Sequence, residues 1–446
     1  MTPDTVSIRL QSALCVTLRR SFRGWRRLVD GLRIFSRSIS NPQGPLCGAG
    51  VPPVKKDTLL VHAGRSATGP VNPPVARAST ILFEDLAAYD ALRGDRFAGL
   101  RYGIHGTQTL FALEEALTRL EGCHRAIIVP SGLAAITAAL MAVVKPGDHL
   151  LMVDTVYGPT RAFCDGLLAR NGVVTTYYDP LIGSGIADLI RDNTRAIFCE
   201  SPGSLTFEVQ DIPAIVAVAR ERGIAVLLDN TWASPLFFDA LGHGVDISIQ
   251  AATKYLSGHS DVMMGTIATT EAWWRPVRNV VADLGFSTSP DDCYLVLRGL
   301  RTLGVRLRHQ EKSALAVARW LAGQKDVVRV LHPGLEDDPG HALWKRDFTG
   351  ASALFGVELA VTAPAAVSAF VDGLELFGIG SSWGGFESLV VPARFTRAAR
   401  PFPLSGALVR LHVGLEDPED LICDLAGALD AMRAAQDGAA PSAARA

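Results

Sequence analysis

Through residues 107–300, apolar segments of strand length alternate with amphipathic segments of helical period, and this alternation constrains the fold more than any other feature. Arg125–Val129 and His149–Val153 are typical of buried strands, whereas Thr109–Leu120 and Leu133–Val143 are typical of helices. Alternating elements of this kind place helices against a mostly parallel sheet. The sequence therefore predicts an α/β domain over this part of the chain.

The other predicted elements rest on the same signals. Further strands are expected at Val173–Tyr178 and Ala196–Cys199 and in the runs that lead to Asp229 and Lys254, with helices at Thr160–Arg170, Pro213–Arg220, Tyr294–His309 and Ala314–Gly323. Strands at Ser352–Ala360 and Leu408–Val413 predict a smaller C-terminal α+β domain over residues 301–435.

One lysine lies at the end of an apolar strand pattern. The run Ile247–Ala252 leads to Lys254, which is followed by the Gly/Ser-containing loop Leu256–Asp261. Partial desolvation favours the neutral amine of a lysine and its reaction with a carbonyl group. A second buried pattern ends at Asp229. Together they predict pyridoxal phosphate, with Lys254 on the aldehyde carbon and Asp229 keeping the pyridine nitrogen protonated. Alone, such an acid more often caps a helix or lines a loop.

A phosphate-binding turn is predicted after the strand that contains Ile127–Val129. Pro130–Gly132 leads from this strand into a helix that starts at Leu133. The first turn of a helix offers unpaired backbone N–H groups, and glycine lets an anion approach closely. Gly132 and Leu133 are therefore candidate ligands of the cofactor phosphate. The alternative is an ordinary tight turn.

Three longer motifs carry a family resemblance. Gln250–Asp261, Asp229–Trp232 and Tyr102–Thr107 resemble the Cys/Met-metabolism family of pyridoxal-phosphate enzymes, and the resemblance extends over Asp57–Leu425. It implies a fold-type I pyridoxal-phosphate transferase-like fold. It also implies that Thr253 adds a hydroxyl to the phosphate site, and that Tyr157 stacks on the cofactor ring and takes part in catalysis.

The resemblance further implies that the site is shared between subunits. Tyr102 corresponds to a catalytic tyrosine that reaches the phosphate from the adjacent subunit, which predicts a homo-oligomer, most simply a homotetramer built as a dimer of dimers. Two positions on, where the family usually has an arginine, this chain has Ile104. The change removes a charge-assisted partner worth about 1.5–3 kcal/mol. His105 and Arg101 are the neighbouring candidates for the missing charge.

Two C-terminal features concern the substrate. Arg410 lies inside the apolar strand Leu408–Val413, and a buried arginine needs an anionic partner. In the family this partner is the substrate α-carboxylate; the alternative is a structural salt bridge. Ser382 and Trp383 begin a Ser-Trp-Gly-Gly segment that resembles the β-lyase branch, whereas the γ branches tend to have leucine at the tryptophan position.

These resemblances imply β-elimination of a small sulfur amino acid, L-cystathionine, to homocysteine, pyruvate and ammonia, as part of methionine biosynthesis. Alternatives are a γ-lyase, γ-synthase or cysteine/cystine desulfhydrase of the same family. A regulator that binds the cofactor without turnover is a rival of another class. The joint presence of Lys254, Asp229, Tyr157 and Arg410 argues against it.

Composition excludes several other classes. The 446 residues carry a formal net charge of −2, which gives no reason to expect nucleic acid or an anionic membrane as partner. The longest plainly apolar run, Ala134–Val144, is shorter than the roughly 20 residues of a membrane span. The dispersed cysteines lack a CxxC pair, so we expect reduced thiols, a cytoplasmic protein and no metal site. They are Cys15, Cys47, Cys123, Cys164, Cys199, Cys293 and Cys423.

The two ends differ from the middle of the chain. Residues 1–54 are rich in arginine and poor in acids, which resembles an organellar transit peptide; the alternative is a disordered tail read from an upstream start codon. Residues 55–106 are expected to form an irregular arm, with a helix only at Phe83–Leu92. A disordered tail is expected over 436–446.

Overall fold

The computed structural model describes residues 54–65 and 68–438, so the predictions for the Arg-rich extension lie almost entirely outside the described residues. Backbone contacts separate a small unit, described at Val54 and Leu92–Gly99, from a large unit formed by Lys55–Ala91 and the chain from Leu100 onward. In the small unit the Arg96 guanidinium carbon lies 5.0 Å from the ring centroid of Phe97. Both sheets belong to the large unit.

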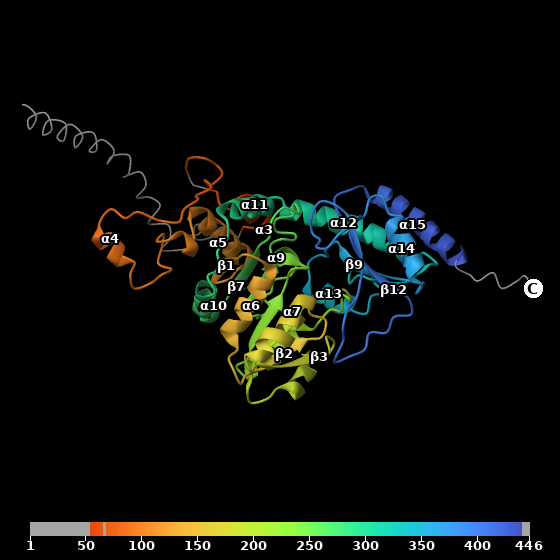
Figure 1. The fold of residues 1–446 in the computed structure, drawn as a ribbon, viewed down its shortest axis with the longest axis horizontal. Coiled ribbons are helices and arrows are strands. Elements are labelled where there is room, and N and C mark those ends of the chain that lie inside the picture. The colour runs from red at the N-terminus through yellow and green to blue at the C-terminus, as the bar shows by residue number, and fades with distance from the viewer. Residues whose placement is uncertain (1–53, 66–67, 439–446) are drawn as a thin grey trace, which may run out of the picture. The chain divides into compact units, whose positions relative to one another are not determined.

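The larger sheet of the described chain has seven strands in the order β1-β7-β6-β5-β4-β2-β3. The strands are β1 (Arg125–Val129), β2 (His149–Val153), β3 (Val174–Tyr178), β4 (Thr194–Glu200), β5 (Ala225–Asp229), β6 (Ile247–Ala251) and β7 (Gly265–Thr269). Only β7 is antiparallel to its neighbours. The predicted mostly parallel fold is confirmed (Figure 1). The prediction omits β7, whose Gly-Thr-Ile-Ala-Thr sequence has a weak apolar signal.

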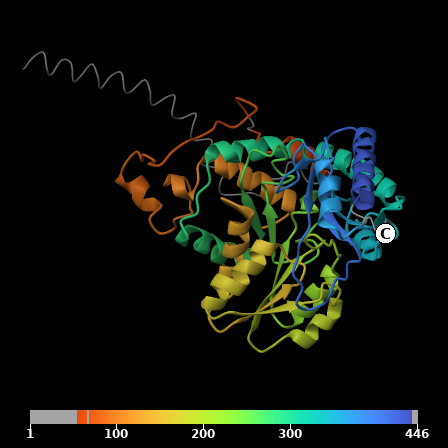
Figure 2. The same cartoon turned by 45° about the vertical axis from the view of Figure 1, so that its right-hand side comes forward.

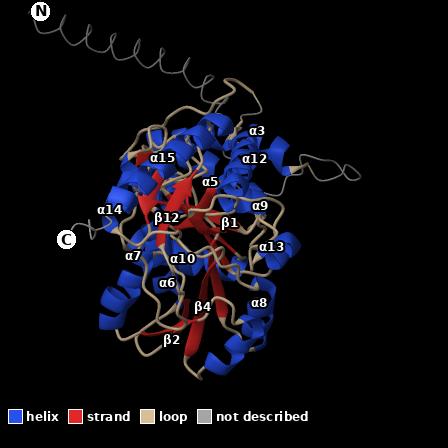
Figure 3. Cartoon of the chain, turned by 90° about the vertical axis from the view of Figure 1, so that its right-hand side faces the viewer, coloured by secondary structure: helices blue, strands red, loops and turns tan. Residues whose placement is uncertain are grey.

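Helices cover both sides of this sheet, with α6 and α7 on one side of β2 and β4 and α8 on the other (Figure 3). The helices are α5 (Gln108–Glu121), α6 (Gly132–Val143), α7 (Gly158–Phe163), α8 (Ile212–Glu221), α9 (Ser234–Phe237), α10 (Glu271–Asp283) and α11 (Pro290–Leu300). Side-chain N-caps define the first residue of two of these helices. The Ser131 hydroxyl accepts the Ala134 N–H at 3.0 Å before α6, and Asp211 accepts the Ala214 N–H at 3.1 Å before α8.

The smaller sheet follows later in the chain, with the order β10-β11-β12-β9-β8. Its strands are β8 (Val327–Leu331), β9 (Leu354–Leu359), β10 (Gly378–Ile379), β11 (Leu389–Pro392) and β12 (Ala407–His412). The helices around it are α12 (Leu303–Ala322), α13 (His341–Asp347), α14 (Pro364–Asp372) and α15 (Pro418–Gly438). Helices α14 and α15 lie side by side (Figure 2). The smaller C-terminal α+β unit expected from the sequence is present.

Helix α12 joins two hydrophobic cores. Leu303 and Leu307, near its start, belong to the core beneath the large sheet. Val317 and Leu321, near its end, belong to the core of the small sheet. Because one helix serves both cores, the predicted boundary between residues 300 and 301 stays a prediction. Helix α15 continues past residue 435 to Gly438, so the first residues of the predicted tail are helical.

The arm is less irregular than predicted. It contains α3 (Lys56–Val61), α4 (Leu86–Ala91) and a 3-10 turn at Gly103–His105. Helix α4 is shorter than the predicted Phe83–Leu92, and α3 is absent from the prediction. Tertiary contact stabilises α3, since Leu60 is buried and Asp57, on the same helix, pairs with Arg308 of α12 at 2.8 Å.

Two predicted helices have different limits. The pattern Thr160–Arg170 forms α7 and then a π-helical turn, Cys164–Leu168. The pattern Tyr294–His309 is interrupted after Leu300, where α11 ends and α12 begins. None of the helices in the described part of the chain is long and apolar enough to cross a membrane.

Candidate active site

The candidate site lies where the parallel strands of the large sheet end. Asp229 is the last residue of β5, Glu200 is the last residue of β4, and Lys254 follows β6. In open α/β sheets this carboxyl edge is where ligands bind, because neighbouring crossovers diverge there. The fold therefore brings the predicted lysine and acid to one edge.

Lys254 contacts the C-terminal part of the chain. Its Nζ donates a hydrogen bond to the Ser382 hydroxyl at 2.5 Å and lies 5.2 Å from the ring centroid of Trp383. Burial and then the positive charge of Arg410 lower the pKa of Lys254 to about 8, and Asp229 opposes this shift. The amine is thus much closer to neutrality at physiological pH than an ordinary lysine.

Gly384 allows the Ser-Trp-Gly-Gly segment to approach the lysine. Its φ is +84°, and a Cβ there would lie 3.0 Å from the backbone carbon of Lys254. Its N–H donates to Nε2 of His412 at 3.1 Å. Burial lowers the pKa of His412 to about 3, so this ring stays neutral and remains an acceptor. A larger residue at position 384 would push the segment away from Lys254.

Asp229 is held by the residue two positions later. One carboxylate oxygen accepts both the N–H of Thr231 at 3.0 Å and its hydroxyl at 2.5 Å, and this hydroxyl in turn accepts the Ala251 N–H at 2.9 Å. Burial raises the pKa of Asp229, whereas the Thr231 hydrogen bonds and the charge of Lys254 lower it. The other oxygen has no hydrogen bond to any described residue.

The predicted phosphate turn is the tight connection from β1 to α6. A Cβ on Gly132 would lie 2.7 Å from the Cβ of Ala251, and a Cβ on Gly265 would lie 2.1 Å from the Ser131 carbonyl oxygen. The close packing requires glycine at both positions. Gly132 and Leu133 are the first two residues of α6, so their N–H groups have no acceptor within the helix, and Leu133 is 37% exposed. They remain available to an anion.

The Thr253 hydroxyl is already hydrogen-bonded within the chain. Its hydroxyl accepts the Met264 N–H at 3.0 Å and lies 3.2 Å from the Met264 carbonyl oxygen, to which it donates. The hydroxyl thus already ties the lysine loop to the segment that precedes β7. Its predicted contribution to phosphate binding stays a prediction.

Tyr157 stands directly before α7 and is 46% exposed. Its N–H donates to the Glu200 carboxyl at 2.8 Å. Burial and then the negative charges of Glu200 and Asp229 raise the pKa of its hydroxyl, while Arg410 lowers it. The phenol therefore stays neutral. Asp229 and Arg410 therefore both lie close enough to Tyr157 for their charges to change its pKa.

Tyr102 contacts residues of its own N-terminal segment. It forms a bridge with Thr80 and its ring centroid is 6.5 Å from that of His105. Tyr102 is 48% exposed and Ile104 is 36% exposed. The Arg101 guanidinium carbon lies 5.9 Å from the Tyr89 ring centroid. The donation of Tyr102 to a neighbouring subunit stays a prediction.

Arg410 projects from the middle of β12. Its Nη2 donates to the Ser382 carbonyl oxygen at 2.8 Å, while its buried Nε has no hydrogen-bond partner. No acid in the described part of the chain lies within ion-pair distance of it, so the structural salt bridge considered as an alternative is not formed there. Burial lowers the pKa of Arg410, but a guanidinium remains charged. The group is available to an anionic ligand.

The sequence prediction omits two groups of the site. Glu200 ends an apolar strand just as Asp229 does, so the same signal could have found it. Arg306 lies on α12, donates to the Tyr255 carbonyl oxygen at 2.9 Å and packs against Gly258, both in the lysine loop. No local pattern marks Arg306, because its partner is far away in sequence.

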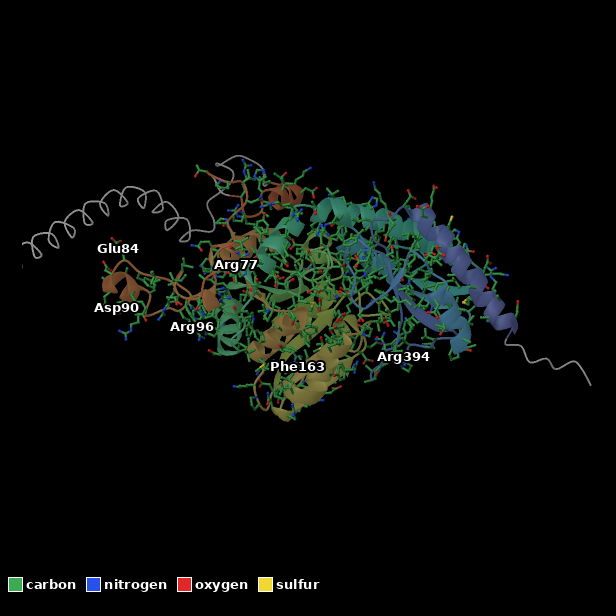
Figure 4. All side chains as sticks on the ribbon, turned by 45° about the horizontal axis from the view of Figure 1, so that its top comes forward. Arg77, Glu84, Asp90, Arg96, Phe163 and Arg394 are labelled. Carbon is green, nitrogen blue, oxygen red and sulfur yellow. The ribbon has the colours of Figure 1, made fainter. Side chains whose placement is uncertain are left out.

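A hollow of about 300 Å³ adjoins α7 and is lined by residues of this helix and of the loop that contains Arg394. Figure 4 labels Arg394 and Phe163, the last residue of α7. The Asp154 carboxylate fixes this loop by accepting the N–H groups of Ala398 and Ala399, each at 2.8 Å, and it also pairs with Arg161 at 2.5 Å. The hydrogen bonds from these three residues lower the pKa of Asp154 against the effect of burial.

Residues 57–430 match the sequence profile of the family described as Cys/Met metabolism PLP-dependent enzyme. The chain belongs to this family. The chain is similar to members of the Cys/Met-metabolism family whose names state different reactions. "Cystathionine beta-lyase MetC" of Escherichia coli (strain K12) is 44% identical over 383 residues, which are 83% of this chain and 97% of the relative. "L-alanine/L-glutamate racemase" of Wolbachia pipientis wMel is 40% identical over 393 residues, 84% and 97% of the two chains.

A solved structure supports the same family. The crystal structure of cystathionine gamma synthase from Xanthomonas oryzae pv. oryzae in complex with cystathionine has a TM-score of 0.79 and 34% identity. The match covers 86% of this chain and 100% of that chain. The fold-type I assignment is confirmed. Because these Cys/Met-metabolism enzymes differ in reaction, the reaction has to be argued from the residues of the site.

The residues of the site fit the pyridoxal phosphate used by this family. An amine of lowered pKa lies near a partly buried carboxylate, and two N–H groups without an intrahelical acceptor start α6. A buried Arg410 Nε without a partner adds a place for a carboxylate. No cluster of metal-ligating side chains occurs among the residues that the structure describes.

Proposed function

We propose that this chain is a pyridoxal-phosphate-dependent carbon–sulfur lyase that splits L-cystathionine by β-elimination into homocysteine, pyruvate and ammonia. One observation carries the choice of reaction. The Ser-Trp-Gly-Gly segment lies directly at the lysine amine, with the Ser382 hydroxyl 2.5 Å and the Trp383 ring centroid 5.2 Å from Nζ. This segment is the one that resembles the β-lyase branch. A role in methionine biosynthesis in the cytoplasm follows, unless residues 1–54 direct import into an organelle.

The residues of the large sheet would hold the cofactor. Lys254 would carry its aldehyde carbon, Asp229 would hold the ring nitrogen protonated, and the amides of Gly132 and Leu133 would bind the phosphate. Tyr157 would lie against the ring. When bound, pyridoxal phosphate supplies a carbonyl that bonds reversibly to amines and a cationic ring that withdraws electrons from the substrate Cα.

Lys254 would be the group that accepts the proton in the reaction. As a free amine with a pKa lowered to about 8, its Nζ accepts the Cα proton of the substrate. The Ser382 hydroxyl, at 2.5 Å, accepts a hydrogen bond from Nζ and so orients the amine. Asp229 remains anionic opposite the cofactor. Homocysteine then leaves as a thiolate from Cβ.

Arg410 supplies the anchor for the substrate. Its free Nε, together with one terminal nitrogen, can bind the α-carboxylate bidentately, as planar guanidinium groups do. The hydrogen bond from Nη2 to the Ser382 carbonyl couples this anchor to the segment that contacts Lys254. A bound carboxylate and the base are thereby held by the same short segment.

A second subunit would complete the site. Tyr102 is half exposed, and its contacts within the described chain include Thr80 and His105. The arm also exposes apolar side chains, with Leu82 at 91% and Val71 at 67%. Such surface is typical of an interface. We therefore assign Tyr102 to the neighbouring site of a homotetramer.

The product formed from cystathionine tests the proposal. Purified protein loaded with pyridoxal phosphate should release pyruvate and homocysteine in equal amounts. Release of 2-oxobutyrate with cysteine would replace the proposal by a γ-lyase. Conversion of L-alanine to D-alanine without keto acid would replace it by a racemase, the activity named for one relative.

A further inference from the structure

Two carboxyl groups end adjacent parallel strands at the site. Glu200 is the last residue of β4, Asp229 is the last residue of β5, and the two are partners in the strand register. Neighbouring strands lie about 4.8 Å apart, so residues in register are close neighbours. Asp229 has a proposed role opposite the cofactor, whereas Glu200 has none.

Glu200 has few polar partners. Its Oε2 accepts the Tyr157 N–H at 2.8 Å, and its main-chain oxygen accepts the side-chain amide of Gln210 at 2.8 Å. No lysine or arginine in the described ranges forms an ion pair with it. Oε1 makes no hydrogen bond to a described residue and is the oxygen left to carry a proton.

The charged and titratable groups around the pair come from four elements. They are Asp229 on β5, Tyr157 before α7, Lys254 after β6 and Arg410 on β12. The charge of Lys254 lowers the pKa of Asp229, and the charge of Arg410 lowers the pKa of Tyr157 and of Lys254. Glu200 feels chiefly the negative charge of Asp229.

The two carboxyl groups are therefore unequal. Asp229 accepts two hydrogen bonds from Thr231 and is attracted to Lys254. Glu200 accepts a single main-chain N–H. Burial raises the pKa of both, and the charge of Asp229 raises that of Glu200 further, well above its ordinary value. Two neighbouring carboxylates in one partly buried site cannot both ionise at low cost, so the charge goes to Asp229, which has more hydrogen bonds and a nearby cation.

We propose that Glu200 is a positioning residue that stays protonated at neutral pH, holds the main chain of Tyr157 and leaves Asp229 as the single anion of the pair. A neutral carboxyl can accept the Tyr157 N–H without competing with Asp229 for a cationic ring nitrogen. This inference rests on the proposed cofactor site. Its test uses the full chain without cofactor or substrate, so a failure of the lyase assignment would be seen separately.

The first experiment measures the thermal midpoint of the cofactor-free protein and of Glu200→Gln between pH 5 and 8. A buried acid with a raised pKa loses stability as pH rises above its unfolded value, and glutamine removes this loss. The midpoint of Glu200→Gln should therefore rise relative to the unmodified protein by roughly 2 °C per pH unit. The exposed Glu221→Gln is the matched control and should show no trend. A difference in thermal midpoint between Glu200→Gln and the unmodified protein that does not change with pH would overturn the proposal.

A second measurement does not depend on stability. In infrared spectra of the full-length protein at pH 7, the unmodified chain should show a protonated carboxylic acid band that Glu200→Gln lacks. Hydrogen exchange of the Tyr157 amide should be at least tenfold faster in Glu200→Ala than in Glu200→Gln, because only glutamine keeps an acceptor. An unchanged infrared band, or equal exchange in both variants, would contradict the assignment.

Discussion

The Nζ of Lys254 lies 2.5 Å from the hydroxyl oxygen of Ser382, although 128 positions separate the two residues. The contact joins the lysine loop at the edge of the large sheet to the segment that precedes β11 in the C-terminal unit. The same segment presents its Ser382 carbonyl oxygen to Arg410 at 2.8 Å. Lys254 and Arg410, the proposed base and the proposed carboxylate anchor, both contact this short loop, so changes in the loop should affect chemistry and substrate binding together.

The lysine amine should control cofactor uptake. Only its neutral form can bond to a carbonyl, and the pKa of Lys254 is lowered to about 8. The rate of pyridoxal-phosphate incorporation into the cofactor-free protein should rise about tenfold per pH unit below this value and level off above it. Visible absorbance measures this rate. A midpoint near the ordinary lysine value, about 10.4, would show that the amine is not desolvated. Lys254→Ala should gain no visible band.

Arg410 should affect the substrate rather than the cofactor. Arg410→Ala removes a charge-assisted contact worth about 1.5–3 kcal/mol, so KM for cystathionine should rise about 10- to 100-fold. The visible band of the bound cofactor should persist. Arg410→Lys should recover only part of the affinity, because an ammonium group cannot bind a carboxylate bidentately. A lost band with unchanged KM would place Arg410 in the cofactor site instead.

Trp383 should control substrate choice. Its ring lies 5.2 Å from Lys254 Nζ and 5.4 Å from the ring of Tyr255, so it forms a wall beside the base. Trp383→Leu should retain the cofactor and change the ratio of kcat/KM for cystathionine to that for cystine by at least tenfold. Trp383→Phe is the matched control and should keep the original preference. If the ratio of the two kcat/KM values is equal in all three proteins, Trp383 does not determine substrate choice.

The sequence predicts those parts of the site that depend on local pattern. The strands that end at Asp229 and before Lys254, and the turn at Gly132, follow from apolar runs that stop at a polar or small residue. The contacts of Lys254 with Ser382 and of Arg306 with the lysine loop join distant segments, so no local signal predicts them. Strand β7 escapes prediction because its composition is nearly neutral in hydropathy. The role of Tyr102 stays a prediction, because it would involve a second chain.

Glu121 should make stability depend on pH. It ends α5, is buried, and lies 3.3 Å from both the Ser248 hydroxyl and the Gln250 side-chain nitrogen on β6. Burial raises the pKa of Glu121 to about 7. Its folded pKa exceeds the unfolded value, so its contribution is fully present below about pH 4.3 and is lost as pH rises through 7. Well above pH 7 this loss of stability reaches about 4 kcal/mol.

Glu121→Gln removes this ionisation. The thermal midpoint of the variant should match that of the unmodified protein near pH 5 and exceed it by a few degrees at pH 8. Glu115→Gln, on the same helix in an exposed ion pair with Arg119, is the matched control and should change little at either pH. A midpoint gap that does not depend on pH would show that Glu121 ionises normally.

Shared sites predict rescue between two inactive variants. Lys254→Ala subunits lack the base but retain Tyr102, whereas Tyr102→Ala subunits retain the base. If Tyr102 serves the neighbouring site, random mixed dimers combine an intact Tyr102 from one subunit with an intact Lys254 from the other at about one quarter of all sites. Refolding an equal mixture should therefore recover up to about one quarter of the lyase activity, while each variant refolded alone stays inactive. Recovery should fall to zero when the variants are mixed without exchange of subunits. An inactive refolded mixture would show that Tyr102 acts within its own chain.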